Sequence, residues 1–443
     1  MTLHVDLSDV AAHASASQSL TGIQRVQLEY VRFIVRKNDR KSEIFADLYG
    51  ADVDLGPLFH APHAGADAVM AQMRLLFGPA SAGRSRWPLA ETRAKAALKL
   101  RWAGGVLRRA AGGSRRRFGP SDCLYVGGAF WAHPPSVRTY ERAARDGCDV
   151  AILFHDVLPV AAPDLADPGC RPLFERMLRL RARAITVSRH SQAQIESARR
   201  ALGAADDLPP ATIVPLAHEF AAAPRNFVAG GAPTLRAAAL QGRSFALCVG
   251  TVEPRKNQLP LIRLWERLAR EIGPDWPRLV VAGKPGWRCE ETLRALKAAD
   301  AASPHVWIEA PTDDELAWLY GRPRLTVFPS LAEGWGLPIG ESLWFGKPCV
   351  ASNAASMPEV GGALCAYANP RRIETFAEPI IRLVRDADHY HASVAAIRAS
   401  RLRTWEETAE ALLDASAPLR ADDGAGPQRR VSRARGSGVP AAL

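Results

Sequence analysis

Short apolar runs alternate along most of this 443-residue chain with longer segments in which apolar residues recur at helical spacing. This alternation predicts β-strands that are each followed by a helix, which is the pattern of a parallel sheet covered by helices. The runs predict strands at residues 3–7, 43–48, 123–126, 150–154, 184–187 and 212–215, then at 245–249, 278–282, 305–308, 325–328 and 348–352. We therefore expect an α/β protein.

The strand and helix pattern fails between residues 217 and 243, where prolines and glycines favour turns. We expect a first doubly wound domain at 1–216 with a basic insertion at about 66–120, a linker at 217–243, a second doubly wound domain at 244–400, a closing helix at 401–419 and a disordered tail at 420–443. Ligands of such sheets bind beyond the carboxyl ends of the strands, so the two domains predict a cleft between them.

The composition is that of an ordinary globular protein, with 47% hydrophobic and 23% charged residues. Seven scattered cysteines without CxxC spacing predict neither disulfides nor a zinc site and fit a reducing cytoplasm. We expect no signal peptide and no membrane-spanning helix, because no apolar stretch is long enough. The pairs Asp52 with Asp54 and His60 with His63 have no further ligands nearby in sequence, so we expect no metal.

The net charge of +11 is concentrated in one segment, because residues 84–117 hold eleven basic residues and one acid. Leu98, Trp102 and Leu107 interleave with these cations in the manner of a basic amphipathic helix. One interpretation is therefore peripheral contact of residues 84–118 with an anionic membrane. The alternative is a solvated insertion. We expect no nucleic-acid partner, because the chain has no signature of an RNA- or DNA-binding module.

The most informative motif is FPSLAEGWGLPIGE at residues 328–341, which leaves a predicted strand, bends at two glycines and begins a helix. Gly334 and Gly336 let the backbone approach a ligand closely, and the amides of a helix start favour an anion. Glu333 and Glu341 flank the bend and can face one cleft from different depths.

The spacing E-G-W-G-L-P-x-x-E resembles the E-x7-E motif of the retaining GT-B glycosyltransferases of family 4, or group 1. The resemblance implies two Rossmann-like domains facing across a cleft and a nucleotide diphosphate sugar as donor, with no cofactor or metal. It also implies that Glu333 contacts the donor sugar and Glu341 the ribose, while the diphosphate or sugar meets the backbone of Gly334, Trp335, Gly336 and Leu337.

A second motif, VGTVEPRKN at residues 249–257, resembles the diphosphate-binding segment of the same family. Lys256 matches the lysine that contacts the distal phosphate, where an ammonium stabilises the charge that develops on the leaving group. Many relatives have an arginine directly after the glycine, where this chain has Thr251. Arg255 either replaces that charge or points to solvent.

Further candidate residues follow other predicted strands. Lys284, in VAGKPGW, resembles a nucleotide-binding turn or is a surface turn, and Gly22, in SLTGIQRV, resembles the glycine loop near the diphosphate. His155, in FHDVLP, matches the family's histidine near the reacting carbon. On the acceptor side we place Asp156, Arg189 and Trp131.

The resemblance implies a hexosyltransferase that retains anomeric configuration. The two lysine-containing motifs look most like those of bacterial mannosyl- or rhamnosyltransferases of surface polysaccharide synthesis, so GDP-mannose is the first choice of donor and a glycan or lipid-linked saccharide the acceptor. We expect a cytoplasmic protein, either free or peripheral at the inner face of the membrane. The alternatives are a catalytically inactive GT-B binding or scaffold protein and a same-fold epimerase or phosphorylase.

Overall fold

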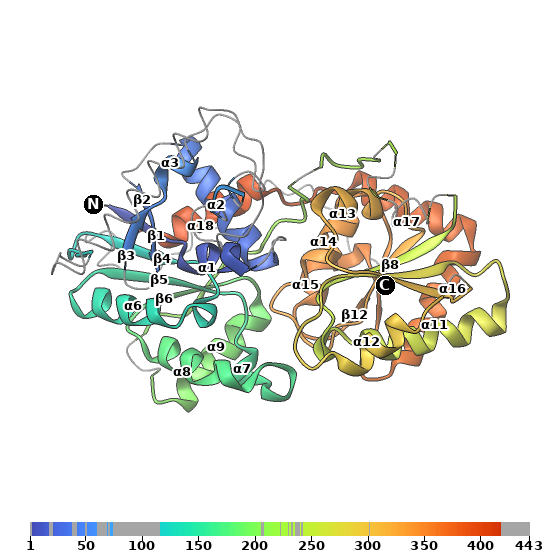
Figure 1. Ribbon diagram of the computed structural model, residues 1–443, viewed down its shortest axis with the longest axis horizontal. Coiled ribbons are helices and arrows are strands. Elements are labelled where there is room, and N and C mark those ends of the chain that lie inside the picture. The colour runs from blue at the N-terminus through green and yellow to red at the C-terminus, as the bar shows by residue number, and fades with distance from the viewer. Residues whose placement is uncertain are drawn as a thin grey trace, which may run out of the picture.

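Two β-sheets, each packed against helices, form the two halves of the molecule in the computed structural model (Figure 1). The structure describes residues 2–16, 21–37, 42–48, 51–59, 69, 71–73, 116–204, 208–221, 223–228, 230–231, 234, 240, 242–300 and 302–417. The tail predicted at 420–443 and most of the basic insertion predicted at about 66–120 lie outside these residues. Among the described residues, no helix combines the length and apolar character that crossing a bilayer requires.

The first sheet has seven strands in the order β3-β2-β1-β4-β5-β6-β7, and every pair except β2 with β3 is parallel. Its strands are β1 (Leu3–Asp6), β2 (Ser42–Leu48), β3 (Ala51–Asp54), β4 (Cys123–Val126), β5 (Asp149–Phe154), β6 (Arg183–Thr186) and β7 (Thr212–Ile213). Its helices are α1 (Ser8–Ala16), α2 (Gly22–Lys37), α3 (Gly56–Phe59), α6 (Pro135–Arg145), α7 (Leu158–Ala161), α8 (Arg171–Arg179) and α9 (Arg189–Ala201).

The second sheet is parallel throughout, with six strands in the order β10-β9-β8-β11-β12-β13. Its strands are β8 (Phe245–Val249), β9 (Arg278–Ala282), β10 (His305–Ile308), β11 (Leu325–Phe328), β12 (Cys349–Ser352) and β13 (Ala366–Ala368). Its helices are α11 (Gln258–Ile272), α12 (Glu290–Lys297), α13 (Asp313–Tyr320), α14 (Leu337–Trp344), α15 (Met357–Gly361), α16 (Ala377–Arg385) and α17 (Ala387–Ala399). The last helix, α18 (Trp405–Ser416), returns to the first domain, where the Ser416 Oγ lies 2.6 Å from the Tyr30 hydroxyl of α2.

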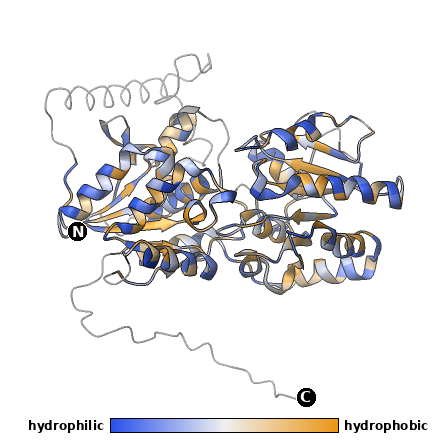
Figure 2. Ribbon diagram, turned by 90° about the horizontal axis from the view of Figure 1, so that it is seen from below, coloured by the Kyte–Doolittle hydropathy of each residue, from blue (hydrophilic) through white to orange (hydrophobic). Residues whose placement is uncertain are grey.

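Both faces of the central strands are buried, which is why the sequence shows continuous apolar runs. In β4, for example, Cys123 and Tyr125 join the apolar cluster on one side of the sheet, and Leu124 and Val126 join the other. The strands are largely orange in Figure 2, whereas the helices carry much of the blue. Helix α2 presents Val26 to the cluster that also contains Trp335 of the second domain, so the two domains share apolar contacts.

Asp52 and Asp54 lie on the antiparallel strand β3, which was not among the strands predicted from the sequence. Strand β3 lies at the edge of the sheet and carries an aspartate at every second position, so it has no continuous apolar run by which a buried strand is predicted. Asp52 accepts hydrogen bonds from the Arg116 guanidinium at 2.8 and 3.0 Å. This aspartate is therefore part of an ion pair. The short strand β13 was also missed.

Candidate functional site

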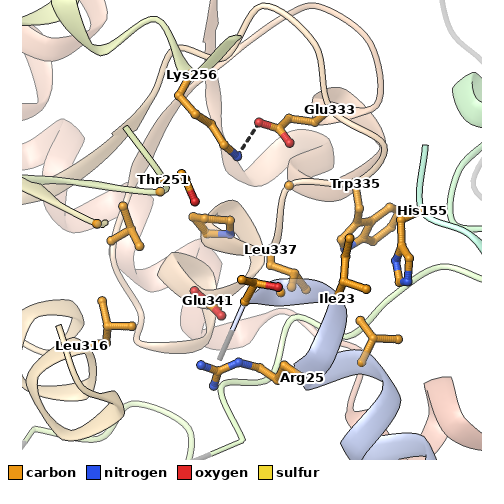
Figure 3. Close-up of a pocket in the computed structure, with 18 of the residues that line it drawn as sticks. Ile23, Arg25, His155, Thr251, Lys256, Leu316, Glu333, Trp335, Leu337 and Glu341 are labelled. Carbon is orange, nitrogen blue, oxygen red and sulfur yellow. Dashed lines mark hydrogen bonds and ion pairs between the residues drawn. The ribbon is translucent and has the colours of Figure 1, made fainter. Parts of the chain in front are cut away.

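A pocket of about 870 Å³ lies between the two domains and is lined by residues of both (Figure 3). The first domain contributes the start of α2 and the loop after β5. The second domain contributes the ends of β8 and β9, the start of α13, and the bend at residues 333–337, whose last residue is the first of α14. Because these are carboxyl ends of parallel strands and starts of helices, the pocket is where a doubly wound fold binds its ligands.

Three charged side chains form one cluster in this pocket. The carboxylate of Glu333 accepts hydrogen bonds from Lys256 Nζ at 2.6 Å and from Arg255 Nη1 at 2.5 Å. A short 3-10 turn, Pro254–Lys256, presents both cations, and Asn257 in the left-handed conformation ends it before α11 begins. The side chains of Arg255 and Lys256 are 18% and 13% exposed, so the sequence alternative of a solvent-directed Arg255 is wrong.

The Glu333 carboxyl is strongly perturbed by its surroundings. Burial raises its pKa, but the nearby charges of Arg255 and Lys256 outweigh burial and lower the pKa to about 2. Arg255 also donates to Glu253 Oε1 at 2.6 Å and to the backbone oxygen of Ala332 at 3.1 Å. The ionised carboxylate therefore holds the two cations in place.

The bend after Glu333 has a geometry that requires glycine at two positions. A Cβ at Gly334 would lie 1.6 Å from the backbone oxygen of His155, and Gly336 adopts a φ of +117° at the N-cap of α14. Ser356 Oγ donates to the backbone oxygens of Glu333 and Trp335 at 2.8 and 2.9 Å. The constrained turn thus places the free backbone N–H groups of the first turn of α14 beside the two cations. Both kinds of group favour an anionic ligand.

Glu341, one turn into α14, lies at another end of the pocket. Its Oε2 accepts a hydrogen bond of 2.6 Å from the Tyr320 hydroxyl. Burial raises the pKa of this carboxyl, while Arg25 and the Tyr320 hydrogen bond act in the opposite direction. Lys284, at the end of β9, also lines the pocket, and burial lowers its pKa.

His155 and Asp156 approach the bend from the first domain. His155 Nε2 lies 2.9 Å from the backbone oxygen of Gly127, so this nitrogen carries the proton and donates it. Burial lowers the pKa of His155, and the ring is neutral at pH 7. Asp9 holds the same glycine loop by accepting from the Ala129 amide at 2.9 Å. Asp156 accepts from the Leu158 amide at 3.1 Å, and burial raises its pKa.

Most of the residues expected at the site line this one pocket: His155, Asp156, Gly22, Thr251, Arg255, Lys256, Lys284, Glu333, Gly334, Trp335, Gly336, Leu337 and Glu341. Two others have different surroundings. Trp131 packs against Phe130 and Phe174, with ring centroids 5.1 and 4.9 Å apart, and is not among the lining residues. The backbone amide of Arg189 donates to Glu359 Oε2 at 2.8 Å. The acceptor-side role of these two residues stays a prediction.

Several lining residues were not predicted from the sequence, among them Ile23, Arg25, Asp313 and Leu316. Thr312 and Glu315 form a capping box at the start of α13, and this pattern after an apolar strand could have marked the segment. Nothing local marks Arg25, which lies within an amphipathic helix. Among the described residues, no group of three or more His, Cys, Asp or Glu side chains could hold a metal ion.

Residues 236–399 match the family model described as glycosyl transferases group 1. This chain carries a group 1 glycosyltransferase domain. The match confirms the family that the motifs predicted, and the two facing sheets give the whole described chain the GT-B fold. HepE from Anabaena, solved with UDP and glucose, has a TM-score of 0.58 to this chain at 14% identity, covering 94% of this chain and 98% of HepE.

Two similar curated proteins come from Escherichia coli. O-antigen chain mannosyltransferase B is 32% identical over 154 residues, which are 35% of this chain and 40% of that protein. The serotype-specific mannosyltransferase WbdA is 27% identical over 297 residues, which are 66% of this chain and 36% of WbdA. The alignments thus span about two fifths or less of the relatives' lengths. The group 1 domain contains the second sheet and the Glu333 cluster.

Proposed function

We propose that this chain is a glycosyltransferase that moves a hexose from a nucleotide diphosphate sugar to a glycan or lipid-linked saccharide in surface polysaccharide synthesis. Mannose is the first choice of sugar and GDP-mannose of donor. The observation that carries the proposal is the cluster in which Lys256 and Arg255 hold Glu333 beside the bend. The names of the similar proteins, mannosyltransferases of the O-antigen and of a serotype, support the choice of sugar.

The arrangement of the pocket suggests how the donor lies. The diphosphate would meet Lys256, Arg255 and the amides at the start of α14, because these groups supply positive charge and free N–H donors. Its arrival would exchange the cations' contacts with Glu333 for contacts with phosphate oxygens. Glu333 could then accept hydrogen bonds from sugar hydroxyls. Glu341 has one carboxylate oxygen engaged by Tyr320 and would receive the ribose hydroxyls with the other.

The reaction would proceed with retention on the face of the sugar that carries the diphosphate. The bond between the anomeric carbon and the phosphate oxygen breaks, the acceptor oxygen bonds to the same carbon, and the leaving phosphate takes the acceptor's hydroxyl proton. Lys256, Arg255 and the bend amides would stabilise the charge that develops on the phosphate. His155, neutral and held by Gly127, would hydrogen-bond to the sugar through its other ring nitrogen.

The carboxylates of the pocket support this route over a covalent intermediate. A nucleophile must be free to attack the anomeric carbon. In the donor complex Glu333 would accept hydrogen bonds from sugar hydroxyls, and Asp156 accepts a backbone hydrogen bond within its own loop. Both carboxylates are therefore better placed to orient groups than to attack.

The proposed lipid-linked acceptor is inferred from the positive charge of residues 84–117. The cations of residues 84–117 would attract an acceptor carried on an anionic lipid, with the enzyme in the cytoplasm and peripheral at the inner face of the membrane. Apart from the last residues, this segment lies outside the described part of the chain. Flotation with anionic vesicles tests this point, and equal binding by the full chain and by a variant lacking 84–118 would contradict it.

The function itself is tested with the full chain, a panel of GDP-mannose, UDP-glucose and other nucleotide sugars, and a saccharide acceptor. We expect transfer from one donor, with product of unchanged anomeric configuration by NMR, and transfer lost in Lys256→Ala. A product formed from donor alone would indicate an epimerase, and a requirement for inorganic phosphate would indicate a phosphorylase. Donor binding without any turnover would indicate a binding protein.

A further inference from the structure

An ion pair crosses from one domain to the other next to Glu341. Arg25 Nη2, on α2 of the first domain, lies 2.7 Å from Asp313 Oδ1, at the first residue of α13 in the second domain. The two side chains are 8% and 16% exposed, and both residues line the pocket. In Figure 3 the Arg25 guanidinium lies below Glu341 and points into the same space.

The surroundings of Arg25 hold it in this position. Its guanidinium carbon lies 5.0 Å from the centre of the Phe220 ring, a cation–π distance. Phe220 packs against Tyr320, the residue whose hydroxyl donates to Glu341. Phe220 and Tyr320 therefore link Arg25 by direct contacts to Glu341, the carboxylate expected to bind ribose. Burial lowers the pKa of Arg25, but the charges of Asp313 and Glu341 outweigh burial and raise it, so the cation is stable here.

Helix α2 also links this arginine to the diphosphate end of the pocket. The helix begins at Gly22, and Gly22 and Ile23 line the pocket together with Arg25. A rigid helix fixes the position of its first amides relative to a side chain one turn further on. The contact with Asp313 thus sets where the start of α2 lies over the second domain.

We propose that Arg25 is a nucleotide-binding residue supplied by the first domain, and that its ion pair with Asp313 couples closure of the two domains to occupation of the nucleoside end of the pocket. This inference rests on the proposed function only in the identity of the ligand. An arginine has five N–H donors, and the Asp313 contact leaves donors for oxygen or nitrogen acceptors of a nucleoside. Glu341 and Asp313 would otherwise leave this end of the pocket with uncompensated negative charge.

The energetics favour a role in closure. When the domains separate, both charges return to water, so the pair contributes little to the folding of either domain by itself. In the closed state, loss of one partner leaves the other charge buried without compensation, which is strongly unfavourable. Single substitutions at the pair should therefore disfavour the closed state, and the nucleotide-bound state with it.

The test uses full-length Arg25→Gln, Asp313→Asn and the double variant, with Arg176→Gln as a matched control. Arg176 pairs with Glu141 at 2.8 Å within the first domain and away from the pocket. Small-angle scattering without ligand reports domain opening, and calorimetry with GDP reports binding. We expect each single variant to have a larger radius of gyration than the parent and to bind GDP roughly tenfold more weakly. The double variant should bind GDP no more weakly than Arg25→Gln, because Arg25→Gln already removes both the ion pair and the donors to the nucleotide. The control should match the parent.

The outcomes separate the two proposals. If the parent binds neither GDP nor UDP nor ADP, the proposed function fails. The radius of gyration of the ligand-free variants then still shows whether the Arg25–Asp313 pair holds the domains closed. Parental scattering in both single variants overturns the interdomain bridge. Parental GDP affinity in variants that open overturns the coupling to binding. If Arg25→Gln does not fold, Asp313→Asn and Arg25→Lys carry the same comparison, with thermal unfolding as the check of folding.

Discussion

The α-carbon of Gly334 faces the backbone oxygen of His155 so closely that a Cβ at position 334 would lie 1.6 Å from that oxygen. The contact joins the bend of the second domain to the loop after β5 of the first. Because the opposing atom belongs to the backbone, no rotation of a side chain can relieve the overlap. The two domains can approach this closely at the pocket because residue 334 is glycine and has no side chain.

Gly334→Ala should keep both domains folded but hold them apart at the reacting centre. A displacement of about 1 Å in an active site can lower the rate about 100-fold, and we expect a loss of that size in kcat/KM. Steady-state kinetics with the donor found above and thermal unfolding measure the two effects. Gly231→Ala is the control, because a Cβ at 231 meets no atom of the described residues within 4 Å. Equal activity of both variants would contradict the close contact.

Lys256 and Glu341 should differ in the step that they affect. Lys256→Ala removes the cation proposed to contact the leaving phosphate, so kcat should fall by about 100- to 1,000-fold. Glu341→Ala removes the expected ribose contact, so the donor Kd should rise while the turnover of bound donor changes less. Single-turnover rates and calorimetry separate the two quantities. The site assignment is wrong if both variants transfer sugar at the parental rate.

The Glu333 carboxyl should make stability depend on pH in the acid range. Its pKa is lowered from 4.5 to about 2 in the folded protein, so the unfolded chain binds this proton first as pH falls. The stabilisation is fully present above about pH 4.5 and is lost as pH falls through about 2. We expect the difference in melting temperature between the parent and Glu333→Gln to shrink below pH 4.5. A difference that grows with acidity would contradict the ion pairs.

His155 should be neutral at pH 7, with its proton on Nε2. Long-range proton–nitrogen NMR of the imidazole reports this tautomer directly, and a proton on Nδ1 would contradict the bond to Gly127. Because burial lowers the pKa below 6.5, the unfolded chain takes up the histidine proton more readily than the folded one. The parent should therefore lose stability relative to His155→Gln as pH falls below about 6.5, as measured by thermal unfolding.

Several strands could be predicted from the sequence because they are buried on both faces. The runs at 245–249 and 325–328 coincide with β8 and β11, since every position of such a strand favours an apolar residue or a partner in the core. Strand β3 could not be predicted in this way. Its aspartates alternate at a sheet edge, and the neighbouring Arg116 that pairs with Asp52 lies 64 positions away.

Local sequence also determined which chemical groups stand at strand ends: Lys256 after β8, Glu333 after β11 and His155 after β5. Their motifs are contiguous, so glycine, proline and charge spacing are visible without a structure. The meeting of Lys256 with Glu333, 77 positions apart, required the strand order of the second sheet. The pairing of Arg25 with Asp313, 288 positions apart, required both domains and the angle between them. Periodicity and turn chemistry act over a few residues and are recorded in the chain, whereas contacts between distant segments depend on how the finished sheets and helices pack.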